Sequence, residues 1–146
     1  HLTGKGKDQE VRDAVKAAGV ADRWHVIDYL STMEDALAVA DLVVCRSGAG
    51  TVAEMTALGL PCVYVPLPIG NGEQKLNAAD HVAQGGALLV ADHDLTSDYV
   101  RGTIFPLPGS EKLSEMAIAS RALARPDGAQ QLADLTESTL QKKDQK

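Results

Sequence analysis

Aromatic side chains are scarce in this sequence of 146 residues, which contains one tryptophan, one phenylalanine and three tyrosines. The hydrophobic core must therefore be built from Val, Leu, Ile and Ala, and a hydrophobic content of 45% supplies enough of these for one domain. An excess of basic charge is also missing, since 14 basic residues stand against 20 acidic ones and the formal net charge is −6. This balance argues against nucleic acid or an anionic membrane surface as the main partner.

Cysteines and long apolar runs are rare as well. Cys45 and Cys62 are the only cysteines, and neither has neighbours at a metal-ligand spacing, so we expect buried, reduced thiols in a cytoplasmic protein. No apolar run approaches the roughly 20 residues that span a bilayer. Residues 1–6, HLTGKG, read as the exit from a strand that lies upstream, and we therefore expect a fragment of a longer protein.

The most informative stretch is 41–66, DLVVCRSGAGTVAEMTALGLPCVYVP. Residues 42–45 are a continuous apolar run, which is typical of a strand buried on both faces of a parallel sheet. The small residues at 47–50 leave room for another molecule to approach the main chain. Thr51 and Glu54 fit a capping box, T-x-x-E, which predicts a helix beginning here. Because helix N-termini bind anions, this turn predicts a phosphate cradle.

Strands and helices alternate along the rest of the chain. Helices are predicted at residues 8–18, 33–40, 73–84, 96–105, 110–124 and from 127 to about 140, and further strands at 24–30, 62–65 and 87–90. Ser31 and Glu34 form a second apparent capping box, before the helix at 33–40. This order predicts an α/β fold with a Rossmann-like, doubly wound parallel sheet of four strands.

In such sheets ligands bind beyond the carboxyl ends of the strands. The glycine turn after Cys45 and the loop at 66–72 both lie at that end, on consecutive strands. We therefore expect the two segments to face one ligand together.

Three segments carry a resemblance to a known family: ADLVVCRSGAGTVAE at 40–54, GLPCVYVPLP at 59–68 and EQKLNA at 73–78. In this order they resemble the donor-binding, C-terminal domain of the MurG-type glycosyltransferases, which move N-acetylglucosamine from UDP to a lipid-linked muramyl-pentapeptide. The resemblance implies the C-terminal half of a two-domain GT-B architecture. Residues 1–140 would be the UDP-sugar donor-binding domain, lacking its first strand and the N-terminal acceptor domain, and 141–146 a polar tail.

The resemblance also implies which residues bind the substrate. Contacts to the diphosphate would come from the turn and its rim, namely Arg46, Ser47, Gly48, Ala49, Gly50 and Thr51. Glu54 would bond the ribose hydroxyls. The sugar hydroxyls would be held by Gln74 and Glu73 with Asn77 close by, although the family often has Gln or His where this chain has Glu73. The main chain near Leu30, with Met33 beside it, would meet the uracil.

The resemblance places the general base in the missing acceptor domain, so no catalytic residue is assigned here. No cofactor and no metal are expected. Asp92 and Asp94 match a D-x-D motif that binds a divalent ion in another class of glycosyltransferase, but their place before a helix capped by Thr96 favours a turn. Arg46 could instead bond carbonyl groups at the strand ends. The whole protein would be peripheral on the inner face of the cell membrane, with no membrane contact from this domain.

Three other functions remain open. The chain could be the separate donor-binding subunit of a bipartite glycosyltransferase, which a gene without an acceptor domain in the same reading frame would support. It could be a domain like those of UDP-sugar epimerases, although the carboxylates and histidines such enzymes need in the cleft are not evident. A non-catalytic nucleotide-binding regulator is the third.

By itself, this chain is expected to bind UDP and UDP-N-acetylglucosamine without magnesium and to transfer little or no sugar, since the general base would be missing. Calorimetric titration with and without magnesium, together with a transfer assay, checks both statements. Detectable transfer by the isolated chain would contradict the second, and a magnesium requirement would make Asp92 and Asp94 metal ligands after all.

Overall fold

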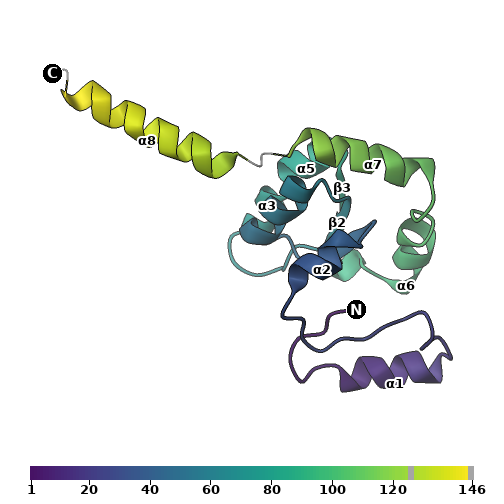
Figure 1. The fold of residues 1–146 in the computed structure, drawn as a ribbon. Helices are drawn as coiled ribbons and strands as arrows, with labels where there is room; N and C mark the ends of the chain where they lie inside the picture. The colour runs from purple at the N-terminus through teal and green to yellow at the C-terminus, as the bar shows by residue number, and fades with distance from the viewer. Residues whose placement is uncertain (125–126, 145–146) are drawn as a thin grey trace. The chain divides into compact units, whose positions relative to one another are not determined.

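The computed structural model describes residues 1–124 and 127–144, and it divides into two compact units, His1–Ala40 and Asp41–Lys146 (Figure 1). Each unit is described by itself. Residues 125–126, directly before the helix predicted from 127, lie outside the described residues, as do residues 145–146 of the predicted tail.

The unit His1–Ala40 contains two helices, α1 (Gln9–Ala17) and α2 (Met33–Ala38). Helix α1 confirms the prediction for 8–18 and ends before Gly19, whose φ of 66° is readily adopted only by glycine. The second predicted capping box is wrong, because the residue before α2 is Thr32 and no side chain caps this helix.

The predicted strand at 24–30 is also wrong. Only Ile27 pairs, in one parallel bridge with Leu2, supported by hydrogen bonds from the Thr3 N–H to the Ile27 carbonyl (3.1 Å) and from the Ile27 N–H to the His1 carbonyl (2.9 Å). Gly4, at φ 93°, then turns the chain away. A β-prone sequence forms a strand only along a partner, and the described residues offer this one a partner for a single bridge.

The unit Asp41–Lys146 is built on a parallel sheet of three strands in the order β1 (Val43–Cys45), β2 (Cys62–Tyr64), β3 (Ala87–Leu89). The prediction of a parallel sheet is confirmed, and the count of four strands is wrong. β2 is central and completely buried. β1 is an edge of the sheet, and Val44 is 47% exposed, so the expectation that β1 is buried on both faces is not met.

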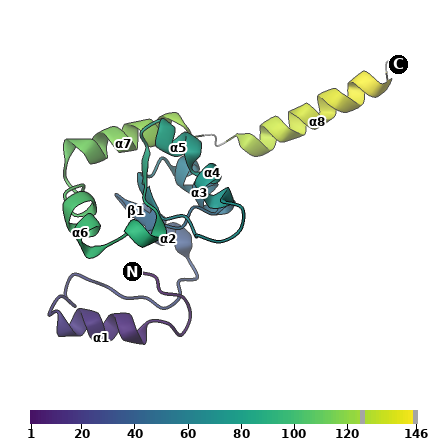
Figure 2. The ribbon, with the colours of Figure 1, turned by 180° about the vertical axis from the view of Figure 1, so that it is seen from behind.

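Helices follow each strand in this unit: α3 (Ala49–Leu58), α4 (Glu73–Asn77), α5 (Ala79–Ala83), α6 (Ser97–Tyr99), α7 (Glu111–Ala122) and α8 (Gly128–Asp144), with a 3-10 turn at Asp92–Asp94 and a π-helical turn at Val100–Ile104. Helix α3 packs against α7 and α4, and α5 against β3 (Figure 2).

The predicted boundaries of these helices are mostly right. Thr96 caps its helix as predicted, accepting a hydrogen bond from the Tyr99 N–H (3.2 Å), and Ser110, where the helix at 110–124 was predicted to begin, accepts one from the Leu113 N–H (3.2 Å). The helix predicted at 73–84 is divided at the buried Ala78, where α4 ends and α5 begins. Helix α8 runs to Asp144 and so includes most of the predicted tail.

The core of this unit is aliphatic, as the composition predicts. It gathers Val63, Val65, Val90, Ile104, Leu107 and Met116. Tyr64 is the one aromatic residue buried among the described residues, whereas Phe105 and Trp24 stay exposed. Both cysteines are free thiols.

A buried polar network connects β2, α5 and α7. The His81 ring lies between the Tyr64 hydroxyl (2.9 Å from Nδ1) and the Ser120 hydroxyl (2.7 Å from Nε2), and Ser120 donates to the Gly86 carbonyl (3.1 Å). Since the Ser120 hydrogen is used in that bond, its oxygen accepts from an Nε2–H, and Nδ1 accepts from Tyr64. The network thus assigns a neutral His81 in one tautomer, with all three side chains satisfied.

Gly86 has no room for a side chain. A Cβ there would lie 2.5 Å from His81 Cδ2 and 2.6 Å from Ser120 Oγ. The glycine at position 86 therefore allows the backbone to pack closely against the network.

We expect the free energy of unfolding to fall when the pH is lowered through the range below about 6.5. Burial lowers the pKa of His81. Below the unfolded-state pKa, the His81 ring therefore binds a proton in the unfolded chain but stays neutral in the folded one. The contribution of the neutral His81 ring to the free energy of unfolding is present in full above the unfolded-state pKa. It declines as the pH falls toward the folded-state pKa, with a slope of at most about 1.4 kcal/mol per pH unit.

Histidine NMR titration and urea unfolding at several pH values measure this effect. A His81 ring that titrates at the ordinary histidine pKa of about 6.5 would contradict the prediction.

Candidate functional site

The candidate site begins at the N-terminus of α3, where no side chain caps the helix. The residue preceding the helix is Gly48 (φ −61°, ψ 151°), and the first hydrogen bond within the helix runs from the Val52 N–H to the Gly48 carbonyl (2.9 Å). The N–H groups of Ala49, Gly50 and Thr51 have no acceptor among the described residues. Three backbone donors are therefore available at this helix end.

The predicted capping box at Thr51 and Glu54 is wrong. Thr51 is the third residue of α3 and not the residue that precedes it, and Glu54 is exposed one turn further along. Residues three and four apart lie on one side of a helix, so Glu54 shares a face with Thr51 and Gly50. Its carboxylate has no hydrogen-bond or ion-pair partner in the described part of the chain and is free to meet a ligand there.

The turn before α3 is open on its outer side. A Cβ on Gly50 would meet nothing within 4 Å, and one on Gly48 would meet only Thr51 Oγ1, at 3.9 Å. Neither glycine adopts a positive φ, so the sequence uses them for their small size and not for left-handed geometry. A ligand can therefore reach the three N–H groups without displacing a side chain.

Ser47 lies directly before this turn and is completely buried. Its Oγ is the single buried side-chain polar atom, among the described residues, that has no hydrogen-bond partner. Its main-chain N–H is bonded to Gln74. An unpaired buried hydroxyl is costly, and such groups recur at functional sites.

Two side chains of α4 hold the turn from the other side. Gln74 Oε1 accepts from the N–H of Ser47 (3.2 Å) and from that of Leu67 (2.9 Å), while Asn77 Nδ2 donates to the Ser47 carbonyl (3.1 Å). Gln74 thereby ties the turn after β1 to the loop after β2. The two segments lie together, as the expectation of a shared ligand requires, and that they face one ligand stays a prediction. The bonds from the Gln74 side chain to both backbones were not predicted.

Arg46 lies at the end of β1 and reaches across the carboxyl ends of the other strands. Its Nη1 donates to the carbonyls of Val65 (3.1 Å) and Pro66 (3.3 Å) and pairs with the Asp92 carboxylate. The structural role that we considered for Arg46, bonding carbonyls at strand ends, is thus confirmed. Its pairing with Asp92 was not predicted.

The remaining predicted site residues are less closely tied to the turn. Glu73 is the exposed first residue of α4, and its Oε2 lies 2.9 Å from the place where a Cβ on Gly70 would stand. Leu30 and Met33 belong to the unit His1–Ala40, in which Met33 begins α2 and is 44% exposed. Their role in binding stays a prediction.

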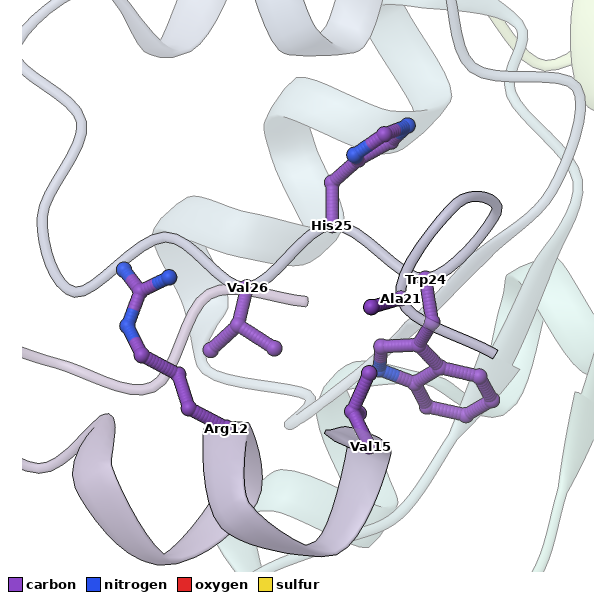
Figure 3. Close-up of a pocket in the computed structure, with 6 residues that line it drawn as sticks. All are labelled: Arg12, Val15, Ala21, Trp24, His25 and Val26. Carbon is purple, nitrogen blue, oxygen red and sulfur yellow. The ribbon is translucent and has the colours of Figure 1, made fainter. Parts of the chain in front are cut away.

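A hollow of about 240 Å³ lies within the unit His1–Ala40 and contains none of the predicted site residues. Figure 3 shows the Val15 and Val26 side chains and the Trp24 ring turned toward one another; the full lining is Arg12, Val15, Ala21, Trp24, His25 and Val26. Its apolar part is the packing of α1 on the segment that follows it.

Metal and membrane sites were also considered. In the described ranges 1–124 and 127–144, no group of three or more His, Cys, Asp or Glu side chains is arranged to hold a metal ion. None of the helices described there combines the length and the apolar character that crossing a bilayer requires.

Known proteins share this sequence and this fold. The family described as glycosyltransferase family 28 C-terminal domain matches residues 1–132. Two curated relatives have the name UDP-N-acetylglucosamine--N-acetylmuramyl-(pentapeptide) pyrophosphoryl-undecaprenol N-acetylglucosamine transferase. The relative from Bifidobacterium adolescentis is 52% identical over 117 residues, 71% of this chain and 30% of the relative. The one from Paenarthrobacter aurescens is 46% identical over 136 residues, 92% of this chain and 36% of the relative.

Among solved structures, Acinetobacter baumannii MurG is similar to this chain with a TM-score of 0.82 and 30% identity, over 94% of this chain and 40% of that one. The chain thus spans about a third of the length of the curated relatives that it matches. The expected α/β fold of one half of a GT-B glycosyltransferase is confirmed by these similarities.

Replacement of Gln74 by Ala is expected to lower the free energy of unfolding by about 1–3 kcal/mol, because it leaves two partly buried backbone N–H groups without their acceptor. Gln74→Glu keeps an acceptor oxygen, so its free energy of unfolding should fall much less. Lys75→Ala, at the exposed next position, is the matched control. Urea denaturation measures all three, and equal stability of the Ala and Glu variants would refute this role of Gln74.

Proposed function

The chain belongs to the glycosyltransferase family 28 C-terminal domain family, and on that premise we propose that it binds UDP-N-acetylglucosamine as the donor half of a MurG-type glycosyltransferase. The observation that carries the proposal is the open, uncapped start of α3, with three unpaired N–H groups and no side chain over them. Relatives whose names specify N-acetylglucosamine transfer support the choice of donor.

The diphosphate is the part of the donor that suits this helix end. Backbone N–H groups and the positive end of the helix dipole attract an anion locally, and they do so despite a net charge of −6 for the whole chain. Ala49, Gly50 and Thr51 would donate to phosphate oxygens, with Gly48 leaving room. Ser47 and Arg46 would complete the cradle from its inner and outer sides.

The ribose and the sugar would be held by neighbouring polar groups. Glu54, on the same face of α3 as the open donors, is suited to accept from both ribose hydroxyls. Because Oε1 of Gln74 is already used, its Nε2 is the atom left to donate to a sugar oxygen. Asn77 and Glu73 would stand beside it, and Leu30 with Met33 would receive the uracil.

The reaction of the whole protein would be an inverting transfer to a lipid-linked muramyl-pentapeptide, in peptidoglycan synthesis. An acceptor hydroxyl attacks the anomeric carbon, the bond to the diphosphate breaks, and UDP leaves with the negative charge. Donors already fixed at the start of α3 would stabilise that charge as it develops. The general base and the acceptor site would come from outside this chain, which covers about a third of its relatives.

Such a protein would act in the cytoplasm, peripherally on the inner face of the cell membrane where its lipid-linked acceptor lies. Because it would help to build the cell wall, it would also affect cell shape and cell division.

Glu54→Ala is expected to weaken UDP binding about tenfold or more, because it removes a charged acceptor of two hydroxyl groups. The free energy of unfolding should change by less than about 0.5 kcal/mol, since Glu54 is exposed and caps nothing. Isothermal titration calorimetry and urea denaturation measure the two quantities.

The control is Glu137→Ala, which makes the same charge change at an exposed helix position outside the predicted site. If Glu54→Ala and Glu137→Ala bind UDP alike, the ribose role is wrong. If the unchanged protein binds no UDP at all, the proposed function is wrong.

A further inference from the structure

One nitrogen of Arg46, which follows β1, bonds acceptors that follow the other two strands of the sheet. Arg46 itself follows β1; Val65 and Pro66, whose carbonyls accept from its Nη1 at 3.1 and 3.3 Å, follow β2; and Asp92, whose carboxylate pairs with the same nitrogen, comes shortly after β3. The carboxyl ends of parallel strands form the edge where ligands bind in such sheets. The guanidinium is therefore fixed at that edge, next to the turn that begins α3.

The opposite side of the guanidinium is not used. Nε and Nη2 have no acceptor in the described ranges of the chain, and the Arg46 side chain is 47% exposed. Those two nitrogens are the pair that bonds a phosphate or carboxylate in the two-pronged geometry peculiar to arginine. Arg46 is thus fixed by one nitrogen and open at the other two.

Two simpler explanations of the Asp92 contact fit the geometry less well. A carboxylate that masked Arg46 until a ligand arrived would take the two-nitrogen edge, whereas Asp92 pairs with Nη1 alone. A contact made only for stability would be weak, because both side chains are exposed, 47% and 39%, and exposed ion pairs contribute little.

We propose that Asp92 is a positioning residue for Arg46: with the carbonyls of Val65 and Pro66 it holds Nη1, so that Nε and Nη2 face the diphosphate of the nucleotide sugar. This inference rests on the proposed function. It gives Asp92 a purpose in the D-x-D segment other than metal binding.

The sign of the effect on UDP affinity separates positioning from simple electrostatics. Removing a negative charge near a diphosphate should by Coulomb's law tighten binding. If Asp92 positions Arg46, its removal should weaken binding instead, because the guanidinium then has to be ordered when the ligand arrives.

The test compares Asp92→Ala with Asp94→Ala in the complete protein encoded by the gene. Asp94 lies in the same 3-10 turn, and its side chain is 63% exposed. Among the described residues its carboxylate contacts only the exposed His93, at 3.4 Å, so Asp94→Ala controls for the loss of one negative charge from this turn. UDP affinity is measured by calorimetry, and the affinity for uridine, which has no phosphate, by ligand-observed NMR.

We expect Asp92→Ala to weaken UDP binding about fivefold and Asp94→Ala to leave it unchanged or slightly tighter. Uridine affinity should be the same in both variants. In an Arg46→Ala background, which itself weakens UDP binding, Asp92→Ala should cause no further loss, since the group that it positions is gone. Asp92→Asn keeps an acceptor oxygen for Nη1, so its UDP affinity should lie between that of Asp92→Ala and that of the unchanged protein.

The inference alone is overturned if Asp92→Ala binds UDP as tightly as Asp94→Ala, if uridine binding falls by the same factor as UDP binding, or if the loss persists without Arg46. Failure of the unchanged protein to bind UDP would overturn the proposed function and this inference together. Loss of UDP affinity in Glu54→Ala without any in Asp92→Ala would leave the proposed function standing.

Discussion

The backbone N–H groups at the start of α3 set the constraint on which the site depends. Buried or partly buried donors must find an acceptor in the protein, in water or in a ligand. At Ala49, Gly50 and Thr51 no acceptor comes from the described residues, because Gly48 has no side chain to cap the helix. A serine or aspartate at position 48 would satisfy one donor and would stand where a phosphate could otherwise approach. The missing cap therefore leaves this helix end open to an acceptor from outside the described residues.

Several groups hold that helix end in place without satisfying it. Gln74 and Asn77 bond the main chain of Ser47 on one side, and Arg46 reaches the carbonyls after β2 on the other. Their bonds go to the backbone of neighbouring loops and leave the three donors of α3 untouched. Such an arrangement suits a preorganised anion site, in which the donors are fixed before the ligand arrives and need not be reorganised.

Stability in the same unit depends on other residues. The His81 network joins β2, α5 and α7 below the surface, and Gly86 allows those elements to approach closely. None of these residues is among the predicted ligand contacts. Substitutions there should change the folded fraction, whereas substitutions at Glu54 or Asp92 should change affinity, and this separation makes the binding experiments interpretable.

The family membership and the fold agree with the local chemistry. A similarity of 30% identity and a TM-score of 0.82 to MurG covers 94% of this chain but 40% of the other, so the chain corresponds to a part of such an enzyme. The uncapped start of α3 lies within the part of the chain that the family match covers, residues 1–132. The proposal of donor binding therefore draws on the relatives and on the local geometry together.

Local patterns in the sequence determined most of the elements and the location of the site. The glycine at position 19, the serine at 110 and the alternation of apolar runs with helical periods act within a few residues, so α1, α7 and the parallel character of the sheet could be predicted. The same local reasoning failed where a pattern had two meanings. T-x-x-E at Thr51 matched a cap that the structure does not form, and residues 24–30 had strand-forming side chains but, among the described residues, a partner for a single bridge.

Only the tertiary structure decided which distant groups meet. Arg46 and Asp92 are 46 residues apart, His81 and Ser120 are 39 apart, and Gln74 accepts from Ser47 across 27. Periodicity and turn chemistry cannot predict such pairs, because these signals are local in the sequence. Strand order and helix packing bring the paired residues together. The sequence by itself thus determined that a turn of small residues leads into a helix near residue 48, and the fold decided which side chains hold that turn and which have no partner among the described residues.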